Sequence, residues 1–277
     1  MGRVEKRRYR RKRRHVRRVL VGLMLLLTAG AAVHALGRDP VRFVTERLGS
    51  NGIAALQGDF DRTAQTREVT LPEESWYAIQ TGIFSSADAA EEKAGAYTSR
   101  GAPGVVVRDG EKWRVFIACY GTEGDASAVR TRLQERQEVD TYLYAWRCPE
   151  LRLRLSGMAG QLDAVEAGFT LLTSTTAALR DMAVELDAAQ LTHAEALTAV
   201  KALDGQVTLW EKTIRSRFAG KLPALVQGML TVTGNWPQRR DTLLNTVDAT
   251  ALSAALKAQG MGMFADVIAW RVQVAAQ

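Results

Sequence analysis

Six side chains in the middle of this sequence combine hydrogen-bonding groups with aromatic rings at strand-like spacing. They are Gln80, Arg114, Phe116, Tyr142, Tyr144 and Trp146. Because alternate residues of a β-strand point to opposite faces of a sheet, such spacing predicts one polar and aromatic face. Flat rings beside a few hydrogen-bonding groups suit sugar rings or unstacked bases. The pattern therefore predicts a binding surface and not a reaction centre.

Residue types that could serve catalysis or metal binding are sparse. The cysteines and histidines of the chain are Cys119, Cys148, His15, His34 and His193. Their spacing fits neither a zinc site nor a dense disulfide framework, and no phosphate-binding loop, zinc-protease motif or nucleophile elbow occurs. The paired carboxylates Glu73/Glu74 and Glu91/Glu92 fall in a predicted linker and on a predicted helix surface, where solvated carboxylates are common. We expect no enzyme activity, no cofactor and no metal.

The positive charge of the chain belongs to its first eighteen residues. The formal net charge is +7, and residues 1–18 contain eleven Lys/Arg and one Glu, so the remaining residues carry −3. Residues 71–150 contain nine Lys/Arg and thirteen Asp/Glu. A nucleic-acid interface normally needs a basic surface. We therefore expect no nucleic-acid partner, although an RNA-binding sheet can have the same order of elements.

An uncharged apolar segment, residues 19–36, follows the basic tail of residues 1–18. As a helix it would extend roughly 27 Å, close to the roughly 30 Å of a bilayer core. Because positive flanks stay in the cytoplasm, we expect a single-pass cell-membrane protein with a cytoplasmic N-terminus and an extracytoplasmic region after Gly37. The alternatives are a cleaved signal peptide, with Val33-His34-Ala35 as cleavage site, and a basic nucleic-acid arm; the length of the segment favours the anchor. Residues 37–75 mix charge, Gly and Pro and are expected to be a linker.

Residues 76–148 read as two copies of a strand-helix-strand unit offset by 36 positions. Strands are expected at Trp76–Phe84, Val105–Val107, Trp113–Ala118 and Thr141–Trp146. Ser85 or Ser86 can cap a helix that Gly101 ends, Asp109-Gly110 predicts a hairpin, and a second helix is expected over Asp125–Arg136. The expected fold is α+β with the order βαββαβ: a four-stranded antiparallel or mixed sheet, ferredoxin-like or RNP-like, with two helices on one face and the other face open.

The expected strand order bears on the two cysteines. With strands one and three as parallel neighbours, Cys119 and Cys148 would lie at opposite edges of the sheet, roughly 20 Å apart and too far for a disulfide. The aromatic stripe itself has another explanation. It could pack under the linker or against the C-terminal region, because aromatic residues are common in strands for packing reasons alone.

Two motifs in this segment resemble the SPOR domain (sporulation-related repeat) of bacterial cell-envelope proteins. They are Tyr-Ala-Ile-Gln-Thr-Gly-Ile-Phe-Ser at residues 77–85, followed by an alanine-rich helix, and Trp-Arg-Val-Phe-Ile at residues 113–117. The resemblance implies the βαββαβ fold and matches the family's strand-one glutamine to Gln80 and its strand-three arginine to Arg114. Ile83 stands where the family has serine, and Ala118-Cys119 where it has Gly-Pro or Gly-Arg.

The resemblance also implies a function. SPOR domains bind peptidoglycan and prefer glycan strands stripped of stem peptides at division or sporulation septa. On this basis we expect a non-enzymatic peptidoglycan-binding protein whose ligand contacts come from the six side chains named first. The rival expectation is an envelope scaffold whose sheet and helical module bind other proteins.

Residues 151–277 are expected to form a helical bundle or hairpin. Apolar residues from Leu162 to Leu186 recur at heptad spacing, and Thr192 with Glu195 predicts the start of a second helix. Further helices are expected over Pro223–Val232, Arg239–Leu256 and Met263–Val274, with a turn at Gly260-Met261-Gly262. Thr176 and Ala183 make the heptad seam thin and permit close approach of another helix. The helices could therefore contact a second copy of the chain or a division protein.

Overall fold

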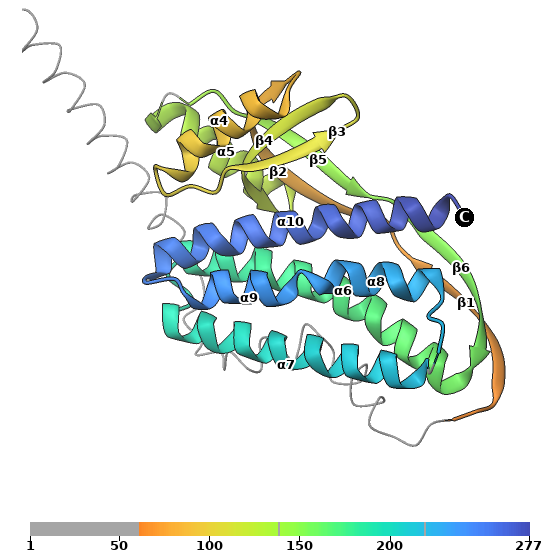
Figure 1. Cartoon of the computed structure of the whole chain (residues 1–277). Helices are drawn as coiled ribbons and strands as arrows, with labels where there is room; N and C mark the ends of the chain where they lie inside the picture. The colour runs from red at the N-terminus through yellow and green to blue at the C-terminus, as the bar shows by residue number, and fades with distance from the viewer. Residues whose placement is uncertain (1–60, 138, 219) are drawn as a thin grey trace, which may run out of the picture.

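The computed structural model describes residues 61–137, 139–218 and 220–277 (Figure 1). The predicted basic tail (1–18), the predicted membrane span (19–36) and most of the predicted linker lie outside these residues. Among the helices of the described part, none is long and apolar enough to cross a bilayer.

The described chain contains two antiparallel sheets and a C-terminal group of helices. The strands are β1 (Ala64–Leu71), β2 (Glu74–Phe84), β3 (Val105–Asp109), β4 (Lys112–Tyr120), β5 (Tyr142–Cys148) and β6 (Leu151–Met158). The helices are α4 (Ala87–Thr98), α5 (Glu123–Gln137), α6 (Ala159–Asp187), α7 (His193–Arg217), α8 (Ala224–Gly234), α9 (Trp236–Leu244) and α10 (Ala249–Ala275). The segment from β2 to β5 confirms the predicted βαββαβ order.

The four-stranded sheet has the order β3-β4-β2-β5, and all its neighbouring strands are antiparallel. The prediction that strands one and three are parallel neighbours is wrong. Helix α4 returns the chain so that β3 runs parallel to β2, and the Gly110-Glu111 hairpin then reverses it. The returning strand β4 therefore lies antiparallel beside β2, and β3 occupies the edge.

Local signals predicted the helix starts correctly. The Ser86 hydroxyl accepts a hydrogen bond from the backbone N–H of Ala89 at the start of α4. At the start of α7 the Thr192 hydroxyl accepts from the backbone N–H of Glu195, whose carboxylate in turn accepts from the backbone N–H of Thr192. This reciprocal pair satisfies two backbone donors that the first turn leaves unbonded.

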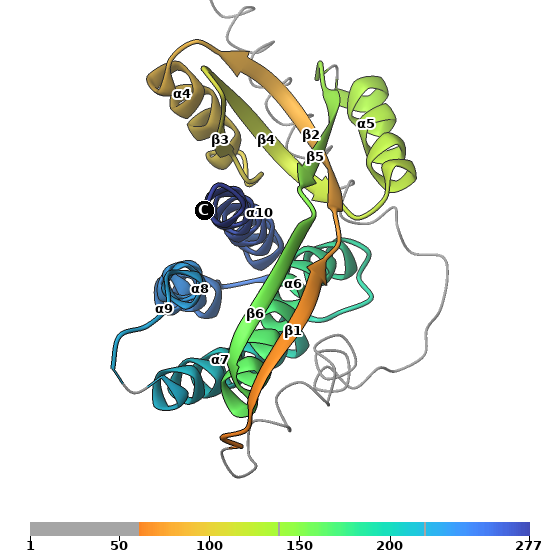
Figure 2. The ribbon, with the colours of Figure 1, turned by 90° about the vertical axis from the view of Figure 1, so that its right-hand side faces the viewer.

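The predicted linker and helical region both contain a strand at their border with the sheet. Residues 64–71 form β1 and residues 151–158 form β6, which pair with each other from Ala64 opposite Met158 to Leu71 opposite Leu151. Two residues separate β1 from β2, and two separate β5 from β6, so the paired strands continue as a β1–β6 ribbon along the helices (Figure 2). The sequence signal for this ribbon was weak because its outer positions are Thr, Glu, Arg and Ser.

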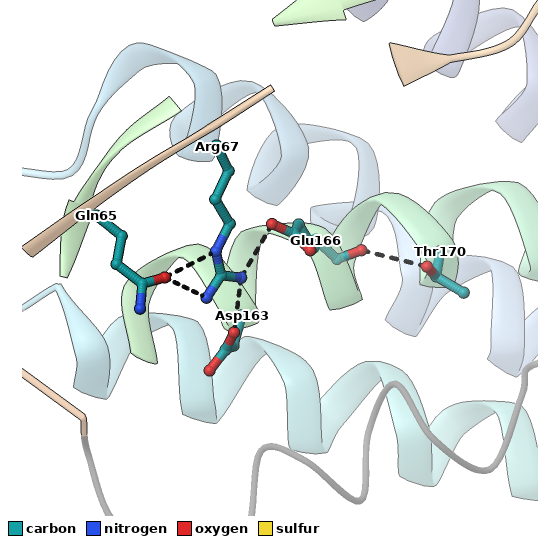
Figure 3. A network of polar contacts seen from close by, with 5 residues as sticks. All are labelled: Gln65, Arg67, Asp163, Glu166 and Thr170. Atoms are coloured by element: carbon teal, nitrogen blue, oxygen red, sulfur yellow. Dashed lines mark hydrogen bonds and ion pairs between the residues drawn. The ribbon is translucent and has the colours of Figure 1, made fainter. Parts of the chain in front are cut away.

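Ion pairs hold the β1–β6 ribbon on α6. Arg67 of β1 donates from Nη1 to Asp163 Oδ1 (2.8 Å) and to Glu166 Oε1 (3.1 Å), while Nε and Nη2 donate to Gln65 Oε1 (Figure 3). On the inner side of the ribbon, apolar residues such as Val69 and Leu153 pack against the main hydrophobic core. The ribbon thus belongs to the helical part of the molecule.

Helix α10 runs without interruption through Gly260-Met261-Gly262, so the predicted turn there is wrong. The glycines serve close packing. A Cβ at Gly260 would meet Leu179 Cβ of α6 at 3.3 Å, and a Cβ at Gly262 would meet Arg239 Nη1 of α9 at 2.9 Å. The real turn lies before Asp248, whose side chain caps α10 by accepting from the Ala251 N–H.

The thin seam of α6 does admit another helix, and that helix is α10 of the same chain. Ser253 of α10 lies close enough for its hydroxyl to donate to the Ala183 carbonyl of α6 (3.4 Å). Helix α10 also lies between the four-stranded sheet and the remaining helices (Figure 1). The sheet therefore has α4 and α5 on one face and α10 on the other.

Candidate functional site

The face of the sheet opposite α4 and α5 carries the residues that the sequence singled out. We call it the aromatic face; it includes Trp76, Ala78, Gln80, Arg114, Phe116, Cys119, Tyr142, Tyr144 and Trp146. Gln80 of β2 pairs with Phe116 of β4 on one side and with Tyr142 of β5 on the other. The predicted placement of Gln80 and Phe116 on one face is therefore confirmed by the strand register.

Four polar side chains form a cluster at one end of the aromatic face. Arg114 donates from Nη1 to Gln80 Oε1 (2.7 Å) and from Nε to Asp109 Oδ2 (2.6 Å). Tyr144 donates from its hydroxyl to the same Asp109 oxygen (3.2 Å), and the Arg114 guanidinium lies over the Tyr144 ring at 4.4 Å. We call Gln80, Asp109, Arg114 and Tyr144 the Arg114 cluster. Strands β2, β3, β4 and β5 each contribute to it.

The electrostatics of the Arg114 cluster favour binding of a neutral or weakly anionic ligand. The Asp109 carboxylate balances the charge of Arg114, and burial, together with the negative charge of Asp109, raises the pKa of Tyr144, so its hydroxyl stays neutral. A guanidinium has five N–H donors in a fixed plane. The Arg114 side chain is 19 % exposed, so part of it contacts solvent at the border of the cluster.

Two exposed side chains border the Arg114 cluster. Tyr142 is 64 % exposed and presents its ring next to Gln80. Ile83 is 50 % exposed and lies directly opposite Arg114 in the β2–β4 ladder. The position where the resemblance expects serine therefore borders the guanidinium, and it presents an apolar side chain instead of a hydroxyl.

The other half of the aromatic face is covered. Phe116 is fully buried and Trp146 nearly so. Phe264 of α10 stacks flat on Trp76, with ring centroids 4.0 Å apart, and meets Trp146 edge to face at 5.2 Å. The prediction of an open aromatic side is wrong for this half, because a helix distant in the sequence occupies it. The alternative, packing of the stripe against the C-terminal region, describes it correctly.

Two arginines from the helices also reach the covered half. The guanidinium of Arg180 in α6 lies over the Trp76 ring at 4.9 Å. Arg271 of α10 donates to the carbonyl oxygens of Pro72 (2.8 Å) and Pro149 (3.0 Å), at the two points where the sheet continues into the ribbon. The covered half is therefore held by aromatic stacking, a cation–π contact and hydrogen bonds.

Three residues that contribute to the aromatic face or to its contacts were not predicted as site residues from the sequence. Asp109 was assigned only to a hairpin, yet it orients Arg114. Trp76 begins the first predicted strand but was not included in the predicted site. Phe264 could have been suspected from α10 itself, because a helix that is apolar on all sides is normally buried between layers.

The cysteines lie on strands that flank β2. Cys119 pairs with Ala78, and Cys148 pairs with Glu74, so the two are roughly 16 Å apart, from four residues along the strand and two strand spacings. Both are free and buried. Burial raises the pKa of Cys119 to about 12 and that of Cys148 to about 11, which keeps both thiols protonated and unreactive.

Within the residues that the structure describes, no group of three or more His, Cys, Asp or Glu side chains is arranged to hold a metal ion. Comparison with known protein families matches residues 73–145 to the SPOR domain. No curated protein and no solved structure matches the chain.

Proposed function

Because this chain carries a SPOR domain at residues 73–145, we propose that it is a non-enzymatic peptidoglycan-binding protein that engages denuded glycan strands. SPOR domains are peptidoglycan-binding domains of division proteins. The observation that supports the proposal here is the Arg114 cluster, in which the two residues matched to the family motif, Gln80 and Arg114, bond directly to each other. They lie beside the exposed ring of Tyr142.

The chemistry of a denuded strand fits this arrangement. Removing the stem peptide from muramic acid leaves a free lactyl carboxylate, which a guanidinium can bind with charge-assisted hydrogen bonds. The sugar hydroxyls and N-acetyl groups suit the hydroxyl of Tyr144 and the guanidinium of Arg114, which the buried amide of Gln80 orients. The exposed ring of Tyr142 offers a flat surface for a sugar ring.

We further propose that residues 19–36 anchor the chain in the cell membrane, with residues 1–18 in the cytoplasm and the sheet outside, at the division or sporulation septum. The uncharged segment and the eleven basic residues before it support this orientation. A fluorescent fusion in dividing cells tests it. Septal fluorescence is expected, and uniform cytoplasmic fluorescence would contradict the anchor.

Pelleting with sacculi tests the ligand. The purified full chain in mild detergent is mixed with sacculi before and after amidase digestion and then sedimented. We expect more chain in the pellet with amidase-treated sacculi, because digestion increases the denuded glycan. Absence of the chain from both pellets would refute peptidoglycan binding.

One observation favours a second function, that of an envelope scaffold whose sheet binds other proteins. The covered half of the aromatic face already holds a protein helix, α10, through Phe264. With α10 displaced, the same rings would pack against a helix of a division protein or of a second copy. The sacculus experiment separates the two functions, because a scaffold of this kind would not sediment with purified glycan.

A further inference from the structure

We propose that the structure shows a closed state of the glycan site, in which α10 occupies half of the aromatic face, and that the sheet turns away from α10 about Pro72 and Pro149 to bind a glycan strand. The inference rests on the proposed function of this face and concerns its regulation. It follows from the position of Phe264, the break between the two sheets and the contacts of Arg271.

Phe264 occupies the place that a sugar ring would take. Its ring is parallel to Trp76 within 2° at a centroid distance of 4.0 Å, and it also contacts Trp146. Trp76 and Trp146 are opposite each other on β2 and β5, so the phenyl ring spans both strands. A glycan strand and Phe264 cannot lie on these two indoles at the same time.

The strand ladders are interrupted between the four-stranded sheet and the β1–β6 ribbon. The β1–β6 ladder ends at Leu71 opposite Leu151, and the β2–β5 ladder begins at Glu74 opposite Cys148. The interval contains Pro72 on one strand and Pro149 on the other, and neither has an N–H to donate to a ladder. The hydrogen bonding between the two strands is therefore interrupted at Pro72 and at Pro149, which lie at the same position along the paired strands. A rotation there would leave both ladders intact.

Arg271 bridges this break in the closed state. Its side chain is almost fully buried, and Nη1 donates to the carbonyl oxygens of both Pro72 and Pro149. These partners are neutral, and a buried cation gains less from neutral partners than from a carboxylate. The guanidinium thus joins α10 to both strands, while its desolvation limits how strongly the closed state is favoured.

Helix α10 is tied to the other helices, so the sheet is the part expected to move. Asp187 of α6 accepts hydrogen bonds from Ser253 and Lys257 of α10. Asp266 of α10 pairs with Arg239 of α9 at 2.6 Å. The β1–β6 ribbon is held to the helices by the packing of Val69 and Leu153 and by the ion pairs of Arg67. Opening therefore separates β2–β5, with α4 and α5, from a rigid group of helices and ribbon.

Two variants weaken the closed state at separate contacts. Phe264→Ala removes the ring that covers Trp76, and Arg271→Gln removes the cation that bridges the prolines. Because the apparent dissociation constant equals the intrinsic one divided by the open fraction, each should bind amidase-treated sacculi about tenfold tighter or more. Matched controls are Phe169→Ala, whose ring packs on Trp270 inside the bundle, and Arg239→Gln between α9 and α10. Neither control should tighten binding.

The native cysteines report opening without any glycan. Cys119 and Cys148 belong to the core under α10, so iodoacetamide at about pH 8.5 should alkylate them slowly in the wild-type chain. Phe264→Ala and Arg271→Gln should raise the alkylation rate about tenfold, and the controls should not. Circular dichroism establishes that each variant is folded; if Phe264→Ala is unfolded, Arg271→Gln carries the test.

The outcomes separate the inference from the proposed function. Faster alkylation together with tighter binding supports the closed state. Faster alkylation with binding equal to that of the wild type would overturn the inference and leave peptidoglycan binding intact. Faster alkylation with no binding by any variant would overturn both. Unchanged alkylation in a folded Arg271→Gln variant would overturn the inference, because loss of this bridge should open the face.

Discussion

The two faces of the four-stranded sheet are covered in different ways. On one face, α4 and α5 come from within the sheet segment and present small residues such as Ala90, Ala94 and Ala126 to Ile79 and Val115. On the other face, α10 comes from the far end of the chain and presents Phe264 to large aromatic rings. The second face also contains a polar cluster, that of Arg114.

This difference in coverage indicates which face of the sheet the domain needs in order to fold. Local helices with small, close contacts form the obligatory core of the βαββαβ unit. The aromatic face carries hydrogen-bonding groups and is covered by α10. The chain between this sheet and the helical region passes through Pro72 and Pro149, where the strand pairing is interrupted. We therefore expect substitutions under α4 and α5 to act on stability, and substitutions on the aromatic face to act mainly on binding.

The largest effect is expected at Gly104, where the chain leaves α4 and enters β3. A Cβ at this position would overlap the Ala94 carbonyl oxygen of α4, which is backbone and cannot move aside. Gly104→Ala should therefore lower the free energy of unfolding by about 3 kcal/mol or more. Gly95→Ala, on the same helix with open space around it, should raise it by up to about 1 kcal/mol. Equal urea midpoints for the two variants would contradict this packing.

The Arg114 cluster should matter for the ligand more than for the fold. Arg114→Ala and Gln80→Ala should each reduce retention on amidase-treated sacculi about tenfold, because a charge-assisted hydrogen bond contributes about 1.5–3 kcal/mol. The ion pair of Arg114 with Asp109 is partly exposed, so Arg114→Ala should lower the free energy of unfolding by about 1 kcal/mol or less. Gln80 is buried, so Gln80→Ala should lower it by about 1–3 kcal/mol. Arg108→Ala is the matched control, since Arg108 lies over Trp113 on the opposite face. Unchanged retention of both cluster variants would mean that the binding face is misassigned.

Neighbouring residues on β4 allow the two faces to be compared by pH. Cys119 lies on the aromatic face, where burial raises the pKa of its thiol from 9.0 to about 12; Tyr120 lies under α4 and α5, where burial raises the pKa of its hydroxyl. Below about pH 9 the folded and unfolded states both keep the thiol proton. Above that pH the unfolded state loses it first, so the free energy of unfolding should fall until the folded pKa is passed.

We therefore expect the free energy of unfolding to fall as the pH rises above about 9. In urea denaturation, Cys119 should lower the free energy of unfolding by roughly 1 kcal/mol between pH 9 and pH 10. Cys119→Ala should flatten the decline in that range, whereas Tyr120→Phe should change it only at higher pH. A decline as steep in Cys119→Ala as in the wild type would indicate that the thiol is not buried and that the aromatic face is already open.

The smallest effect is expected in the β1–β6 ribbon. Arg67→Ala removes the pairs with Asp163 and Glu166, whose side chains are 42 % and 37 % exposed. Solvent screens such pairs, so the free energy of unfolding should fall by about 1 kcal/mol or less. Alkylation of Cys119 and Cys148 should stay slow, because the ribbon moves with the helices. Rapid alkylation in this variant would place the moving boundary within the ribbon instead of at the prolines.

The sequence predicted local features of the sheet and of the helices well, because their signals are local. The Asp109-Gly110 hairpin, the Ser86 and Thr192 caps and the shared face of Gln80 and Phe116 depend on neighbouring residues or on strand alternation. The family match at residues 73–145 then agreed with the resemblance.

Features formed by distant segments could not be predicted in the same way. The pairing of β1 with β6 joins residues about ninety positions apart, and its polar outer side resembles a linker. Gly260 and Gly262 resemble a turn until the helices that approach them are known. Trp146 is covered by Phe264, a residue of a distant helix, so the strand sequence alone does not indicate its burial.

The most direct test of the account measures the distance between the sheet and the helices during binding. Spin labels at Glu111 in the β3–β4 turn and at Arg215 in α7, both exposed, report this distance by pulsed electron paramagnetic resonance. A pair at Glu92 and Glu111, within the sheet unit, is the control. Adding denuded glycan strands should shift the first distribution to a new distance and leave the second unchanged. Glycan binding with both distributions unchanged would contradict a face that α10 closes.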